Sequence, residues 1–128
     1  MSETGSLGRL AGKRLLVVED EYLIAADLCQ MIEDAGGEVV GPAGSVEDAL
    51  DLVAREAGRL DGAVLDINLH DKRVYPVADA LKAHGVPFVF ATGYDASMIP
   101  EPYVSAPRYE KPVDKARLMR LLSAPSWT

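Results

Sequence analysis

The chain has 128 residues, which suits one domain, and 48% of them are apolar, enough to form one buried core. Its formal net charge of −7 argues against nucleic acid or an anionic membrane surface as a partner. A single cysteine excludes an internal disulfide, no apolar run approaches the ~18 residues of a membrane span, and we expect a cytoplasmic protein.

The expected elements begin after an aperiodic, glycine- and serine-containing segment, residues 1–12, which we expect to be a flexible arm. A domain over 13–123 and a tail over 124–128 complete the predicted organisation. Short apolar runs predict buried strands at 14–18, 38–40, 62–65 and 87–91, with a weaker one at 108–110.

The expected helices fill the intervals between the strands. Helical spacing of apolar residues predicts them over 24–35, 46–53 and 76–85, with a last one after Asp114 that carries Leu118, Leu121 and Leu122. Residues 68–75 are polar and irregular. Three prolines in residues 95–107 predict a fourth helix that is short or irregular.

Strands that alternate with helices predict a parallel sheet covered by helices on both faces. Three of the strands end at polar or acidic residues: Glu19-Asp20, Asp66 and Thr92. Sites in open parallel sheets lie outside the carboxyl ends of the strands, so we expect these residues to converge on one edge, near Lys111.

Carboxylates gathered at one edge repel one another unless a cation compensates them. All-oxygen ligands suit Mg²⁺, which keeps several waters and accepts substrate phosphate as a further ligand. A lysine and a hydroxyl could then hold the other oxygens of a phosphoryl group, which leaves one carboxylate as a nucleophile.

Four motifs carry a family resemblance. Val17-Val18-Glu19-Asp20-Glu21, Leu65-Asp66, Ala91-Thr92-Gly93 and Lys111-Pro112, in this order, resemble the receiver domain of two-component response regulators over residues 14–122. The resemblance implies a flavodoxin-like (βα)5 fold, a doubly wound parallel sheet with strand order 2-1-3-4-5. It also implies a single-domain regulator that accepts a phosphoryl group from a sensor histidine kinase and signals to a downstream protein.

The resemblance also implies roles for individual residues. Glu19 and Asp20 match the metal-binding acidic pair, Asp66 matches the phosphoacceptor, and Asn68 matches the position whose backbone carbonyl completes the Mg²⁺ shell. Such a domain catalyses only its own phosphorylation and dephosphorylation.

The remaining matched positions concern the phosphoryl group and the switch. Thr92 matches the switch hydroxyl and Lys111 the phosphoryl-binding lysine. The place of the usual switch aromatic holds Arg108, so Tyr94, two residues after Thr92, is the candidate for that role.

Two other places depart from the usual pattern, because His70 and Val74 stand where proline and glycine are common. The run Pro87-Phe88-Val89-Phe90-Ala91-Thr92-Gly93-Tyr94 resembles the Phe-Ala-Thr-Gly-Tyr receivers of alphaproteobacteria, which are often stand-alone. That resemblance implies a sensor kinase of the HWE or HisKA2 type. His70 by itself is typical of a solvated loop residue.

Two alternatives remain open at this point. A receiver-like adaptor could bind its partner without any phosphorylation. A flavodoxin-like cofactor binder shares the sheet order, but its first strand should lead into a phosphate-cradling loop, and Glu19-Asp20-Glu21 would repel phosphate.

Overall fold

The computed structural model describes residues 9–70, 72–92, 103, 107–110, 118, 120 and 122. Five parallel strands form the main sheet, in the order β2-β1-β3-β6-β7. Their bounds are β1 Arg14–Val18, β2 Glu38–Ala43, β3 Gly62–Asp66, β6 Phe88–Thr92 and β7 Arg108–Glu110. Counted along the main sheet alone, this is the predicted order 2-1-3-4-5.

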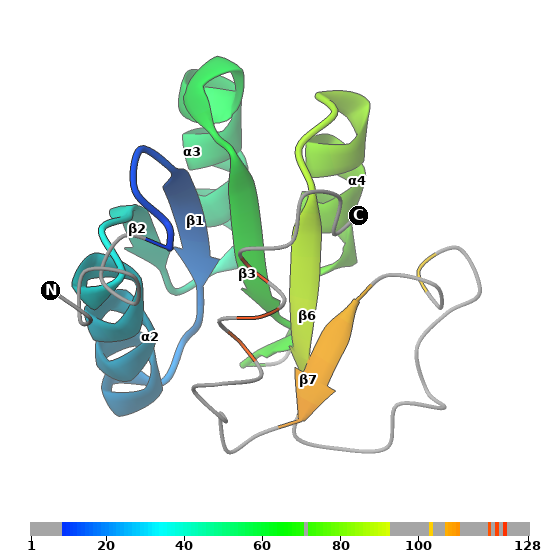
Figure 1. Ribbon diagram of the computed structural model, residues 1–128. Coiled ribbons are helices and arrows are strands. Elements are labelled where there is room, and N and C mark those ends of the chain that lie inside the picture. Colours follow the sequence, from blue (N-terminus) through cyan, green and yellow to red (C-terminus); the bar gives the residue numbers. More distant parts are fainter. Residues whose placement is uncertain are drawn as a thin grey trace, which may run out of the picture.

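Helices cover both faces of this sheet, as Figure 1 shows. Within the described residues they are α2 (Tyr22–Asp34), α3 (Val46–Glu56) and α4 (Tyr75–Ala83), with a short 3₁₀ turn, η1 (Ala57–Arg59). The α3 and α4 side chains pack against one face, and α2 packs against the other together with Leu118 and Leu122. The predicted doubly wound α/β fold is confirmed.

Burial explains why the central strands are nearly continuous in apolar residues. All five residues of β3 are buried, because helices cover the strand on both sides. Alternate residues of β3 enter different cores, with Leu65 on the α3 and α4 side and Val64 on the α2 side. Asp66 ends this strand, and its position at the carboxyl edge is therefore fixed by the packing of both cores.

Helices α3 and α4 begin where the sequence provides starting signals. Ser45 has an extended backbone, and its hydroxyl accepts a 3.1 Å hydrogen bond from the Asp48 N–H at the start of α3. Glu47 and Asp48 add negative charge to the first turn, which the helix dipole favours. Pro76 lies in the first turn of α4, where its missing N–H costs no helical hydrogen bond.

Strand β2 continues further than the sequence predicted, through Gly41 and Pro42 to Ala43. The β1–β2 register shifts between Leu16 and Val18, and Gly41 has a φ of +97°. A Cβ at Gly41 would lie 3.0 Å from the Val17 carbonyl oxygen, so only glycine fits this bulge. Proline is tolerated because β2 is an edge strand.

Two further differences concern segments that we expected to be irregular. Residues 68–75 contain a small antiparallel hairpin, β4 (Asn68–Leu69) and β5 (Lys72–Arg73). Leu10 belongs to the expected arm but is fully buried in the α2 core, and its N–H donates a 2.9 Å hydrogen bond to the Ala35 carbonyl. The packed structure therefore includes residues before the predicted boundary at residue 13.

An aromatic cluster covers the sheet beside α4. Tyr103 stacks on Tyr75 with ring centroids 4.8 Å apart, and Phe90 meets both rings edge-on. The Tyr103 hydroxyl donates a hydrogen bond to Asp79 of α4. Tyr103 is thus fastened to α4, whereas residues 95–102 and 104–106 of the predicted irregular segment lie outside the described residues.

None of the helices in the described part of the chain combines the length and the apolar character that a membrane crossing requires.

Candidate functional site

Three acidic side chains meet at the carboxyl edge of the sheet. Oxygens of Glu19, Asp20 and Asp66 all lie within 4.8 Å of one another. Glu19 and Asp66 are buried, at 3% and 5% exposure, and Asp20 is partly buried. Acids 46 residues apart in sequence are therefore neighbours, as the strand-end argument predicts.

The β1–β3 pairing produces this arrangement. Val18 is the register partner of Leu65, so the residues that follow on each strand, Glu19 and Asp66, leave the sheet side by side. The Glu19 N–H donates a 2.9 Å hydrogen bond to the Ala43 carbonyl, and Glu19 Oε2 accepts one of 3.1 Å from the Glu21 N–H. The edge strand and the start of α2 thus hold the Glu19 backbone and side chain.

The donor set fits a hard divalent cation. Three carboxylates whose oxygens lie within 4.8 Å of one another repel by about 3–4 kcal/mol per pair at the effective dielectric of a protein surface. Carboxylate oxygens are the ligands that Mg²⁺ and Ca²⁺ prefer, and an ion between them would replace this repulsion with attraction. The residues present therefore fit the Mg²⁺ that the resemblance implies.

The β4–β5 hairpin contributes an unexpected contact to Asp20. The His70 N–H donates a 2.8 Å hydrogen bond to Asp20 Oδ2, and His70 Nδ1 lies 3.3 Å from the same oxygen. His70 was expected to be a solvated loop residue, and its side chain is indeed 74% exposed. The sequence did carry a signal for this contact. Proline is common at this place and has no N–H to donate, whereas His70 has one.

The structure describes the other predicted site residues to different extents. Asn68 is half-buried at the start of β4, two residues beyond Asp66. The backbone of Thr92 ends β6 beside Glu110 of β7, so it lies at the same edge of the sheet. The Thr92 side chain, Tyr94 and Lys111 lie outside the described residues.

The chain is similar to known proteins in sequence and in structure. No family model matches the chain. The chain is 33% identical over 117 residues to the phyllosphere-induced regulator PhyR of Methylorubrum extorquens, an alignment that covers 85% of this chain and 42% of PhyR. The chain therefore spans less than half the length of this curated relative.

Two solved structures extend the comparison. SdrG from Sphingomonas melonis is 35% identical with a TM-score of 0.73, over 88% of this chain and 92% of SdrG. The response regulator PhyR from Brucella abortus is 31% identical with a TM-score of 0.76, over 94% of this chain and 50% of that protein.

The fold and the acidic edge define the class, a flavodoxin-like receiver domain. The sequence identity over nearly the full length of SdrG makes the relationship one of family as well as of fold. The chain belongs to the receiver-domain family of response regulators.

Proposed function

We propose that this chain is a response regulator module that accepts a phosphoryl group on Asp66 and signals through protein–protein contacts. The observation that carries the proposal is the acidic cluster, in which Asp66 ends the central strand within 4.8 Å of the Glu19 and Asp20 oxygens. A buried carboxylate beside two others is difficult to explain by fold stability, because burial of like charges is unfavourable.

The proposed reaction uses Asp66 as a nucleophile. A carboxylate oxygen of Asp66 forms a bond to the phosphorus of a phosphohistidine as the nitrogen–phosphorus bond of the donor breaks. The donor imidazole leaves with the electron pair of that bond, and Asp66 becomes an acyl phosphate. Water later attacks this phosphorus and restores the carboxylate.

Glu19, Asp20, Asp66 and the backbone carbonyl of Asn68 are the residues that would hold Mg²⁺. A bound Mg²⁺ supplies positive charge that offsets the charge of the incoming phosphoryl group. By the family resemblance, Lys111 would hold a second phosphoryl oxygen and Thr92 a third. Tyr94 remains the candidate switch aromatic, because Arg108 occupies the usual place.

The proposed donor is a cytoplasmic domain of a sensor histidine kinase, of the HWE or HisKA2 type suggested by the Phe-Ala-Thr-Gly-Tyr motif. A downstream protein would recognise the phosphorylated form. One similar structure, from Bartonella quintana, is that of an anti-anti-sigma factor named PhyR, and we propose a protein as the downstream partner of this chain too.

Phosphoryl uptake from a small donor tests the proposal. The wild-type protein is incubated with Mg²⁺ and acetyl phosphate, and its intact mass should increase by one phosphoryl group that alkali removes. Asp66→Asn should show no increase, whereas the matched control Asp27→Asn, at an exposed position of α2, should behave as the wild type. Equal labelling of Asp66→Asn would overturn the assignment.

A second outcome concerns the adaptor alternative. If neither acetyl phosphate nor a phosphorylated HWE or HisKA2 kinase labels the wild-type protein, the phosphoryl-accepting function is excluded. The receiver-like adaptor would then be the function to pursue.

A further inference from the structure

His70 has a backbone conformation that is exceptional among the described residues. Its φ of +57° is the single positive value at a non-glycine residue in the described part of the chain. His70 follows β4 and opens the two-residue connection to β5, where Leu69 pairs with Lys72. Two-residue hairpins favour a positive φ at this position, because only then does the turn match the twist of the strands.

This conformation places two groups of His70 against one carboxylate oxygen. The N–H lies 2.8 Å and the Nδ1 atom 3.3 Å from Asp20 Oδ2. Asp20 is one of the three clustered carboxylates, so an imidazole stands at the margin of the proposed metal site. A 2.9 Å hydrogen bond from the Val74 N–H to the Ile67 carbonyl closes the base of the hairpin that carries it, and the Ile67 N–H donates a 3.2 Å hydrogen bond to the Ala91 carbonyl of β6, which fastens the hairpin to the sheet.

We propose that His70 is the metal-specificity residue of this site. Its imidazole supplies a nitrogen ligand beside the carboxylate oxygens and so raises the preference of the site for Co²⁺ and Zn²⁺ relative to Mg²⁺. This inference rests on the proposed function in one respect, because it takes the acidic cluster to be the metal site.

The separation of the two donor atoms fits a shared ion. Two ligands bound at about 2.0–2.1 Å to one ion lie roughly 2.8–3.0 Å apart in octahedral geometry and roughly 3.3–3.4 Å apart in tetrahedral geometry. The 3.3 Å between His70 Nδ1 and Asp20 Oδ2 matches the tetrahedral separation, the geometry usual for Zn²⁺. The His70 side chain is 74% exposed, so its ring can turn toward an ion without displacing any core residue.

Ligand chemistry gives the direction of the effect. Carboxylate and carbonyl oxygens suit Mg²⁺, whereas an imidazole nitrogen suits Zn²⁺ and the late first-row divalent ions. A fourth side-chain ligand that is a nitrogen therefore strengthens Co²⁺ and Zn²⁺ binding far more than Mg²⁺ binding. The competing explanation is an exposed His–Asp contact of little energetic value, which would leave metal preference unchanged.

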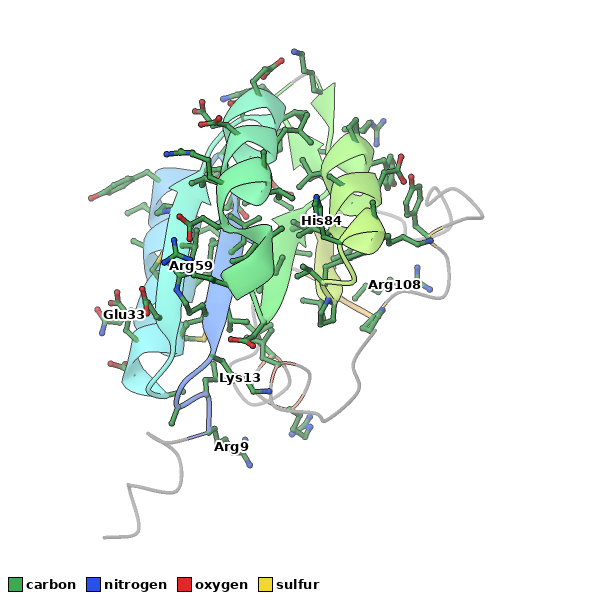
Figure 2. The ribbon with its side chains drawn as sticks, turned by 90° about the horizontal axis from the view of Figure 1, so that it is seen from above. Arg9, Lys13, Glu33, Arg59, His84 and Arg108 are labelled. Carbon is green, nitrogen blue, oxygen red and sulfur yellow. The ribbon has the colours of Figure 1, made fainter. Side chains whose placement is uncertain are left out.

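The experiment compares metal affinities in three untagged proteins: the wild type, His70→Asn and His84→Asn. Asparagine tolerates a positive φ and keeps the backbone N–H to Asp20, so His70→Asn removes the imidazole nitrogens and leaves the backbone contact in place. His84 is the second of the two histidines of the chain and lies at the C-terminal end of α4 (Figure 2). Since α4 returns toward the amino ends of the strands, His84→Asn is a matched control away from the acidic cluster.

Calorimetric titration with Co²⁺ and with Mg²⁺ gives the ratio of the two affinities. We expect His70→Asn to lower Co²⁺ affinity by at least about ten-fold, in the range seen when the surroundings of metal ligands are altered. Its Mg²⁺ affinity should stay near the wild-type value, and His84→Asn should retain both wild-type affinities. An unchanged ratio in His70→Asn, or an equal loss for both ions, would overturn the ligand role.

A second readout needs no variant. Zinc is titrated into ¹⁵N-labelled wild-type protein. The NMR signal of one ring nitrogen of His70 should show the large chemical-shift change that metal coordination produces, while the signals of the His84 ring should not change. If backbone signals of residues 19–20 and 66 respond but the His70 ring does not, the inference fails and the proposed function stands. If no divalent ion perturbs either region, both fail.

Discussion

Tyr103 stacks on Tyr75 with the two rings inclined by only 15°, and its hydroxyl donates a hydrogen bond to Asp79 on the next turn of the same helix. Phe90 of the central sheet packs edge-on against both rings. This cluster joins α4 to Phe90 of β6, two residues before Thr92, and to Tyr103, which lies between β6 and β7 in the sequence. Phe90 therefore contacts α4 directly through Tyr75, and Tyr103 adds a second contact between the two.

Tyr103 should contribute strongly to stability. Tyr103→Ala removes a buried ring, so we expect the free energy of unfolding to fall by about 3–5 kcal/mol. Tyr103→Phe keeps the stack and loses one hydrogen bond to a carboxylate, which should cost roughly 1–3 kcal/mol. Urea unfolding measures both, and Tyr22→Ala, at a position 82% exposed, is the control that should change little. Equal losses of unfolding free energy in Tyr22→Ala and Tyr103→Ala would contradict the role of Tyr103 in fastening its segment to α4.

The same contact predicts a pH dependence at high pH. Burial, followed by the Asp79 carboxylate, raises the pKa of Tyr103 to about 12, against about 10 in the unfolded chain. A raised pKa means that the stabilisation is complete below pH ~10 and is lost as the pH rises toward ~12. The stability difference between wild type and Tyr103→Phe should therefore be constant at neutral pH and shrink above pH ~10. A stability difference between the two proteins that does not change above pH ~10 would show that the titration of Tyr103 is not linked to folding.

Leu10 should matter to the fold although it precedes the first strand. The side chain is fully buried in the α2 core, so Leu10→Ala should lower the free energy of unfolding by about 2–5 kcal/mol. Leu23→Ala makes the same chemical change at a position that is 75% exposed, and it should stay within about 0.5 kcal/mol of wild type. Chemical denaturation of the wild type and the two variants measures these changes in stability, and a neutral Leu10→Ala would contradict the contribution of the Leu10 side chain to the core.

Mg²⁺ should stabilise the folded chain through the acidic cluster. Binding to the folded state alone adds about 2.7 kcal/mol when Mg²⁺ is at 100 times its dissociation constant. Asp20→Asn removes one ligand charge and one source of repulsion, so it should be at least as stable as wild type without Mg²⁺ and gain less from it. Thermal unfolding in MgCl₂ against NaCl of equal ionic strength measures the gain. Asp27→Asn should gain as much as wild type, and an equal gain in Asp20→Asn would place the ion elsewhere.

The sheet and its acidic edge could be predicted because their signals are local. Each inner strand is a short apolar run, and the runs before Glu19 and Asp66 end abruptly at acids. Parallel pairing then brings those acids together whatever the details of the loops. The convergence of Glu19, Asp20 and Asp66 followed from that reasoning, whereas the strand order was what the resemblance to receiver domains implied.

The remaining features depend on contacts that leave no local pattern. Two-residue strands such as β4 and β5 are too short to show a period, so the hairpin and the contact of His70 with Asp20 were missed. Gly41-Pro42 is a turn signal in isolation, and only the edge position of β2 allows the strand to continue through it. The burial of Leu10 and the stacking of Tyr103 depend likewise on distant partners.

Locating the phosphoryl group on the chain is the most direct test of the account. The wild-type protein is phosphorylated with acetyl phosphate and Mg²⁺, treated with borohydride, which reduces an aspartyl phosphate to homoserine, and digested for peptide mass mapping. The account predicts homoserine at position 66 and at no other aspartate. Homoserine at Asp20, or a phosphoryl group that resists borohydride and remains on a side chain other than Asp66, would contradict it.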